Sequence, residues 1–165
     1  MQDIVLKGAD ISAAEIEKSL ESWLKGKTEG VERVLIIPPD YTRSMSGAGQ
    51  ITAMLYRKLK DGFYVDVLPA LGTHERMSDA EIVKMFGDEI PTERFLYHNW
   101  RTDIVDLGEV PSSYVKEISE GKLDYPIKVQ VNRRLVDGTY GLVISVRQVV
   151  PHEVVGMANY TKNVL

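Results

Sequence analysis

The chain contains no cysteine among its 165 residues. Disulfides, zinc–thiolate sites, iron–sulfur clusters and cysteine nucleophiles are therefore excluded. Long hydrophobic runs are missing as well, because segments such as Val34–Pro39 and Leu142–Val146 fall far short of the roughly 20 residues that cross a bilayer. The first ten residues do not show the basic region and the apolar core of a secretory signal. We therefore expect a cytoplasmic protein.

Positive charge is not in excess either. The sequence has 20 lysines and arginines against 24 aspartates and glutamates, a formal net charge of −4. The sequence therefore lacks the excess positive charge that attracts nucleic acid or an anionic membrane surface. The apolar fraction of 44%, the charged fraction of 27% and the mean hydropathy of −0.16 are ordinary for a globular protein and argue against disorder. We therefore expect one globular domain over residues 1–165, with no nucleic-acid and no membrane partner.

Apolar residues follow helix-like and strand-like periods in turn, a pattern typical of α/β layer folds. Serine–glutamate capping boxes at Ser12/Glu15 and Ser78/Glu81 predict two helix starts. The predicted helices are 12–25, one beginning near 46–49, one beginning at 78, and 112–120; the predicted strands are 34–37, 65–68, 95–98, 104–107, 128–131 and 142–146. We expect an α/β fold with an open, mostly parallel sheet, helices on both faces and at least three parallel strand pairs.

Side chains that can do chemistry follow three of these predicted strands. Arg43 comes after the strand that ends near residue 37, His74 after the one near 68, and His152 after the one near 146. Ligands of open α/β sheets bind beyond the carboxyl ends of the strands, so we expect the three loops to meet at one edge. Asp40 is expected close enough to orient Arg43 or His74. Histidine is the usual general base, and arginine can clamp a carboxylate or phosphate with two hydrogen bonds.

Each of these residues also has a plain structural interpretation. Asp40 can cap a turn, Arg43 can be solvated surface, and a lone histidine in a loop is usually exposed. His98 is interpreted as a structural residue at the end of a short strand, and Lys162 by itself as an exposed lysine. No metal-spaced cluster such as His-Glu-x-x-His and no Gly-x-Ser-x-Gly elbow is found, so we predict no metal ligand among these residues.

Three segments, in this order, resemble the N-terminal domain of the nickel-pincer lactate racemase family. The first is Asp40-Tyr41-Thr42-Arg43-Ser44, similar to the family's Asp-His-Thr-Arg-Pro. The second is Ala70-Leu71-Gly72-Thr73-His74-Glu75-Arg76, similar to Ala-Thr-Gly-x-His-Arg. In the third, from His152 to Lys162, a histidine is followed ten residues later by a lysine, as in the family. The resemblance runs from about Val34 to the last residue, and it departs from the family at Tyr41, Ser44 and residues 158–161.

The resemblance implies a racemase or epimerase of 2-hydroxy acids. In the family, a tethered nickel-pincer nucleotide accepts a hydride from the carbon that bears the hydroxyl and returns it to either face. His74 and His152 would then be the two acid–base residues, Arg43 and Asp40 would belong to the substrate-binding loop, and Lys162 would carry the cofactor. The family's enzymes have two domains with the active site between them, so the resemblance implies an N-terminal fragment without its C-terminal domain, inactive by itself.

Two alternatives remain open. The chain can belong to a homologue that uses the same cleft for other chemistry on a hydroxy acid or a nucleotide. It can also be a non-catalytic module, in which Arg43 and the Ser46–Gly49 turn bind an anion and the histidines are bystanders. Histidines that face one pocket favour an enzyme, whereas histidines at opposite ends of the sheet favour the binding module.

Overall fold

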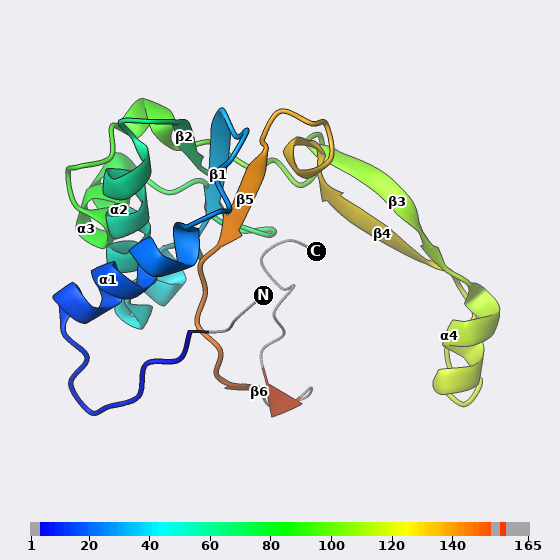
Figure 1. Ribbon diagram of the computed structural model, residues 1–165. Helices are drawn as coiled ribbons and strands as arrows, with labels where there is room; N and C mark the ends of the chain where they lie inside the picture. The colour runs from blue at the N-terminus through cyan, green and yellow to red at the C-terminus, as the bar shows by residue number, and fades with distance from the viewer. Residues whose placement is uncertain (1–3, 153–155, 158–165) are drawn as a thin grey trace.

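The computed structural model describes residues 4–152 and 156–157, in which α-helices and strands alternate as far as residue 132 (Figure 1). The α-helices are α1 (Ala13–Leu24), α2 (Ala48–Leu59), α3 (Asp79–Phe86) and α4 (Ser112–Ile118). The strands are β1 (Arg33–Ile37), β2 (Tyr64–Val67), β3 (Ile104–Val110), β4 (Ile127–Asn132), β5 (Leu142–Ser145), β6 (Pro151–His152) and β7 (Gly156–Met157). Short 3-10 helices lie in the connections: η1 (Tyr41–Ser46), η2 (Thr92–Arg94) and η3 (Arg133–Leu135). Within the described ranges, no helix has the length and apolar character needed to cross a membrane.

Strand β1 is the centre of a parallel sheet whose strand order is β2-β1-β5. Ile36 of β1 lies level with Val67 of β2 and with Ile144 of β5. Because β1 has a neighbour on each side and is covered on both faces, its residues from Val34 to Ile37 are almost completely buried. The α/β fold with a parallel sheet is therefore confirmed, and all three carboxyl ends of its strands point to one edge.

The two faces of the sheet are covered differently. Val34 and Ile36 belong to the larger hydrophobic core, which includes residues of α1, α2 and α3, and these helices lie on one side of the sheet (Figure 1). Leu35 and Ile37 point to the other face, because side chains alternate along a strand. There they pack with Leu68 and with partly buried side chains from η3 and the loops. The second face is thus closed by a 3-10 helix and irregular chain.

Both predicted capping boxes are present. The Ser12 hydroxyl accepts the backbone N–H of Glu15, and the Glu15 carboxylate accepts the backbone N–H of Ser12. Ser78 and Glu81 make the same pair of bonds at the start of α3. Each box satisfies backbone donors that the first helical turn leaves without a partner, which explains why the sequence places these helix starts to within one residue.

Strands β3 and β4 form a separate antiparallel pair, here called the arm (residues 104–132), which extends away from the sheet and carries α4 at its tip (Figure 1). The expectation of at least three parallel pairs is wrong for the described residues, where β1 makes the only two parallel ladders. Most side chains of β3 are exposed, which fits a two-stranded ribbon and not a buried parallel strand. The ladder is bulged between Asp106 and Gly108, a feature that bends a ribbon.

The predicted strand at 95–98 is also a correction. Phe95 makes a single parallel bridge with Val67, and the Leu96 N–H donates to the Val67 carbonyl at 2.8 Å. The chain then leaves the sheet for a turn in which the Asp103 N–H donates to the Asn99 carbonyl at 2.8 Å. His98 therefore lies at the entrance to this turn, at the base of the arm, instead of ending a strand.

Candidate active site

A cavity of about 850 Å³ lies beyond the carboxyl ends of the three sheet strands. Such a volume is near the upper end of the range for small-molecule sites, roughly 300–1,000 Å³. Each strand contributes the loop that follows it, and the base of the arm closes a further side. The polar lining residues include Asp40, Thr42 and Arg43 after β1, Thr73 and His74 after β2, Arg147 and Gln148 after β5, and His98, Gln130 and Asn132 at the base of the arm.

Asp40 and His74 form a hydrogen-bonded pair in this cavity. The Asp40 Oδ2 atom lies 2.5 Å from His74 Nδ1. Asp40 Oδ1 accepts the Thr42 N–H at 3.2 Å and the Thr42 hydroxyl at 2.5 Å. The Asp40 side chain is only 7% exposed, whereas that of His74 is 60% exposed. A buried carboxylate held at both oxygens thus fixes the imidazole through Nδ1, while Nε2 makes no hydrogen bond with the described residues, the geometry of an oriented general base.

The local sequence explains why both residues are held in place. Asp40 is the N-cap of η1, and its carbonyl accepts the Arg43 N–H at 3.0 Å. After β2, the His74 N–H donates to the Leu71 carbonyl at 2.9 Å, which closes a tight turn. Gly72 in this turn has a φ of +56°, a left-handed conformation that glycine adopts without a steric penalty. Two parallel strands therefore deliver two short turns to the same edge.

Arg43 is exposed, lines the cavity and belongs to the same turn as Asp40. Among the described residues, its guanidinium makes no ion pair with a carboxylate. A guanidinium with its donors available beside an oriented histidine can bind the carboxylate of a small acid in a bidentate manner.

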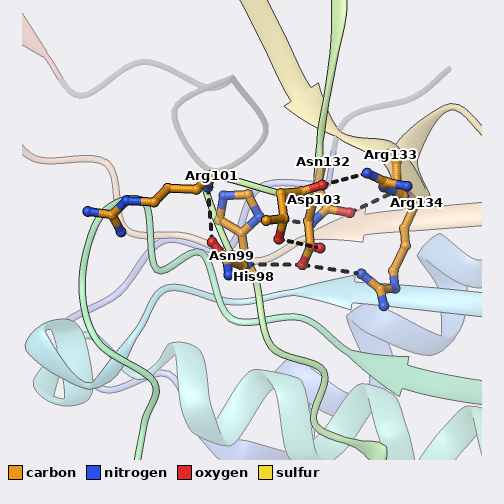
Figure 2. Close-up of polar contacts among 8 residues, drawn as sticks. His98, Asn99, Arg101, Asp103, Asn132, Arg133 and Arg134 are labelled. Carbon is orange, nitrogen blue, oxygen red and sulfur yellow. Dashed lines mark hydrogen bonds and ion pairs between the residues drawn. The ribbon is translucent and has the colours of Figure 1, made fainter.

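A second polar cluster stands at the base of the arm (Figure 2). Asn132 is 7% exposed, and its Nδ2 atom lies 2.8 Å from His98 Nδ1. Its Oδ1 atom accepts the Arg134 N–H at 3.0 Å. Asp103 accepts the Asn99 N–H at 3.0 Å and lies 3.9 Å from the Arg134 guanidinium. These bonds tie the end of β4 to the turn before β3.

Burial lowers the pKa of His98 below its ordinary value of 6.5. The carboxylate of Asp103 acts in the opposite direction, and the Arg134 guanidinium reinforces the lowering. The backbone N–H of Asn99 in turn holds the pKa of Asp103 below its usual range, so this carboxyl is ionised near neutral pH. His98 is therefore neutral near pH 7, although an acidic side chain lies close by.

The structure brings together Asp40, Arg43 and His74 in one cavity, as the strand-end argument predicts. His152 is described in its backbone alone: it belongs to β6, which pairs with β7, and the preceding residue, Pro151, lines the cavity. Lys162 lies outside the described residues. Sequence reasoning missed the cavity positions of His98 and Asn132, because their bond joins residues 34 apart and leaves no local signal.

Comparisons with known proteins support a family relationship. A crystal structure of a protein from Thermotoga maritima is 28% identical and has a TM-score of 0.83; the match covers 97% of this chain and 39% of that one. The lactate racemase apoprotein from Thermoanaerobacterium thermosaccharolyticum is 20% identical with a TM-score of 0.63, over 90% of this chain and 36% of that one, and shows a shared fold. The chain thus spans less than two fifths of the length of these two proteins. No curated protein sequence matches it.

The sequence profile described as the lactate racemase N-terminal domain matches residues 6–165. This match includes the Asp40–Arg43 turn, the Gly72–His74 turn and the arm, so it covers all of the cavity described above. The resemblance inferred from three short segments is therefore confirmed over nearly the whole sequence, and the chain belongs to the lactate racemase N-terminal domain family.

Proposed function

We propose that this chain forms the first domain of a 2-hydroxy-acid racemase or epimerase, and that the hydroxy acid binds in the 850 Å³ cavity. The observation that carries the proposal is the 2.5 Å bond between Asp40 and His74, on the cavity wall that also contains Arg43. An oriented imidazole in one cavity with a guanidinium that makes no ion pair with the described carboxylates matches a substrate that has a hydroxyl next to a carboxylate. The membership of the family supports the same reaction class.

Each residue has a distinct part in this reaction. Arg43 holds the substrate carboxylate, which fixes the position of the neighbouring C2 atom. His74 accepts the proton of the C2 hydroxyl at Nε2. Asp40 accepts the hydrogen bond from Nδ1–H, which keeps this proton on the imidazole and stabilises the imidazolium that forms. In the reverse direction of the reaction, the same imidazolium returns the proton when the hydroxyl of this enantiomer is restored. His152 serves the opposite enantiomer, because a racemase works on both faces of one carbon and one base for each face is the simplest arrangement.

The cavity of about 850 Å³ is larger than a small hydroxy acid needs, and we propose that the remaining space would take the family's nickel-pincer nucleotide. When bound, this group supplies the acceptor for the hydride on C2. Within the residues that the structure describes, no group of three or more His, Asp or Glu can hold a metal ion. The metal would then be held by its organic ligand, which Lys162 would carry, and by a C-terminal domain that completes the cleft.

Peptide mass spectrometry tests the role of Lys162. The intact protein, produced together with the machinery that makes the cofactor, is expected to carry a covalent adduct on Lys162. A Lys162→Arg variant produced in the same way is the control and is expected to lack the adduct. An active protein whose Lys162 stays unmodified would show that the cofactor is not tethered there.

Interconversion of enantiomers tests the reaction itself. The intact, cofactor-loaded protein is incubated with single enantiomers of lactate, malate and mandelate, and the opposite enantiomer is measured by chiral chromatography. His74→Ala and His152→Ala are each expected to reduce turnover by roughly a hundredfold or more. A variant of the exposed Lys18 on α1 is the control and is expected to retain full turnover. Near-normal turnover in both histidine variants would remove them from the mechanism and leave the anion-binding module as the better account.

A further inference from the structure

The cavity contains a second oriented histidine, whose role differs from that of His74. His98 lines the cavity together with Asn132, and both come from the base of the arm, not from the sheet (Figure 2). The Asn132 side chain is bonded at both of its polar ends, to His98 Nδ1 and to the Arg134 N–H. This pair of bonds determines which ring nitrogen of His98 carries the proton.

The assignment follows from the backbone. The N–H of Arg134 can only donate, so the Asn132 atom that meets it at 3.0 Å is the carbonyl oxygen, Oδ1. The other end of the amide, Nδ2, can also only donate, and it lies 2.8 Å from His98 Nδ1. Nδ1 is therefore an acceptor without a proton. A neutral imidazole in this position carries its proton on Nε2.

The Nε2 atom of His98 is available to a ligand. It makes no hydrogen bond with any of the described residues. It is also not completely buried, since it is absent from the fully buried side-chain atoms without a partner. A neutral ring also fits the neighbouring charges: the Asp103 carboxylate favours the protonated form, whereas the Arg134 guanidinium and burial oppose it. A second proton on Nδ1 would place two donors against each other at the Asn132 amide.

We propose that His98 is a substrate-binding residue of this cleft, held by Asn132 in the Nε2–H form so that it donates a hydrogen bond to the carboxylate of the bound hydroxy acid. This inference rests on the proposed function. A nitrogen that can only donate suits an atom that accepts hydrogen bonds throughout the reaction. The carboxylate meets this condition, whereas the hydroxyl gives up its proton and requires a base. His98 thus shares the carboxylate with Arg43 and takes no part in proton transfer.

Ring ¹⁵N NMR of the intact protein tests the tautomer without any need for activity. The His98 signals, assigned by loss in a His98→Gln variant, are expected to show a bare Nδ1 and a protonated Nε2 at pH 7. In Asn132→Asp, a carboxylate faces Nδ1, and the Nδ1 atom is expected to become protonated. A wild-type Nδ1 that carries the proton would overturn the proposal.

Two substitutions of His98 separate its two nitrogens. Asparagine places an acceptor near the position of Nδ1 and so keeps the bond from Asn132, but it has no donor where Nε2 stood. Glutamine reaches further and can place an amide donor near the position of Nε2. The tightest-binding enantiomer of lactate, malate or mandelate is used as the probe, and its Kd for the cofactor-loaded protein is measured by titration calorimetry.

His98→Asn is expected to raise this Kd by roughly tenfold to a hundredfold, as the loss of a hydrogen bond to a charged group does. His98→Gln is expected to bind within a few-fold of the wild type. The amide of the same acid is the control ligand, and His98→Asn is expected to affect its binding much less. In kinetics, His98→Asn raises KM with a small change in kcat, whereas His74→Ala lowers kcat.

The outcomes distinguish the two proposals. If the wild-type protein binds the acid but does not interconvert enantiomers, the racemase proposal fails while the His98 contact stands. If enantiomers interconvert and His98→Asn binds the probe as tightly as the wild type, the His98 proposal fails and the racemase proposal stands. If the wild-type protein binds none of the acids, the carboxylate contact is refuted.

Discussion

Replacing Asp40 with asparagine is expected to reverse the tautomer of His74 with almost no change in shape. Asp40 Oδ1 accepts the Thr42 N–H at 3.2 Å, and this backbone group can only donate. The asparagine must keep its oxygen there, so its Nδ2 takes the position of Oδ2 beside His74 Nδ1. The new amide then donates to Nδ1, and the ring proton moves to Nε2. The atom that should accept the substrate proton is thereby blocked.

The size of the effect follows from these contacts. To act as a base, His74 in Asp40→Asn has to break its new hydrogen bond and lose the stabilisation that a carboxylate gives to the imidazolium. A hydrogen bond to a charged group is worth roughly 1.5–3 kcal/mol, which corresponds to about tenfold to a hundredfold in rate. General-base catalysis as a whole contributes roughly 10²–10⁴. We therefore expect kcat to fall by about a hundredfold in both directions of the reaction.

Chiral chromatography of progress curves from each enantiomer measures this loss. Asparagine is as good an N-cap as aspartate, so the melting temperature is expected to stay close to that of the wild type. Thr42→Val removes one hydroxyl bond to Asp40 but keeps the carboxylate, and it should cost far less activity. The double variant Asp40→Asn/His74→Ala should be no slower than His74→Ala alone, because both changes disable one unit. Turnover of Asp40→Asn within threefold of the wild type would refute the reasoning.

Three further substitutions are expected to separate binding from stability. Arg43→Lys should raise KM at least roughly tenfold with a smaller change in kcat, because an ammonium cannot make the bidentate contact; steady-state kinetics measures both. Gly49→Ala should destabilise the protein by about 1–3 kcal/mol in urea unfolding, because the added methyl group meets the Met85 carbonyl of α3. Gly62→Ala is the control, because nothing lies within 4 Å of the added methyl group there. Tyr140→Phe should lower the free energy of unfolding by about 1 kcal/mol, because the buried Asp66 loses a 2.7 Å hydrogen bond. Burial raises the pKa of Tyr140 from 10.0 to about 12, so its contribution is complete below pH 10 and lost as the pH rises through 12, and the variant should lack this dependence.

Local signals explain what the sequence predicts well. The bonds of each capping box join residues three apart, so four consecutive residues are enough to predict the starts of α1 and α3. The β-branched run at residues 34–37, ended by two prolines, predicts a strand, and β1 covers residues 33–37. The convergence of the Asp40 and His74 turns follows from the parallel direction of β1 and β2, a general property of such sheets.

Pairing between distant segments explains what the sequence does not predict. Residues 95–98 are predicted as a strand, yet only Phe95 makes a bridge with a partner strand, and the chain then turns toward the arm. The arm pairs Ile104 with Asn132, and this register alone carries Asn132 next to His98. A single histidine near a predicted strand end gives no sign of an amide 34 positions away. Its placement in the cavity therefore required the three-dimensional structure.

The difference between an aspartate and an asparagine gives the two described histidines of the cavity opposite chemistry. Asp40 presents an acceptor to Nδ1 of His74, so the proton stays on Nδ1 and Nε2 is a base. Asn132 presents a donor to Nδ1 of His98, so the proton stays on Nε2, which becomes a donor. In both pairs a backbone N–H, from Thr42 or from Arg134, fixes the orientation of the partner side chain. Two identical imidazoles can thus divide proton transfer from substrate binding without a difference in the rings themselves.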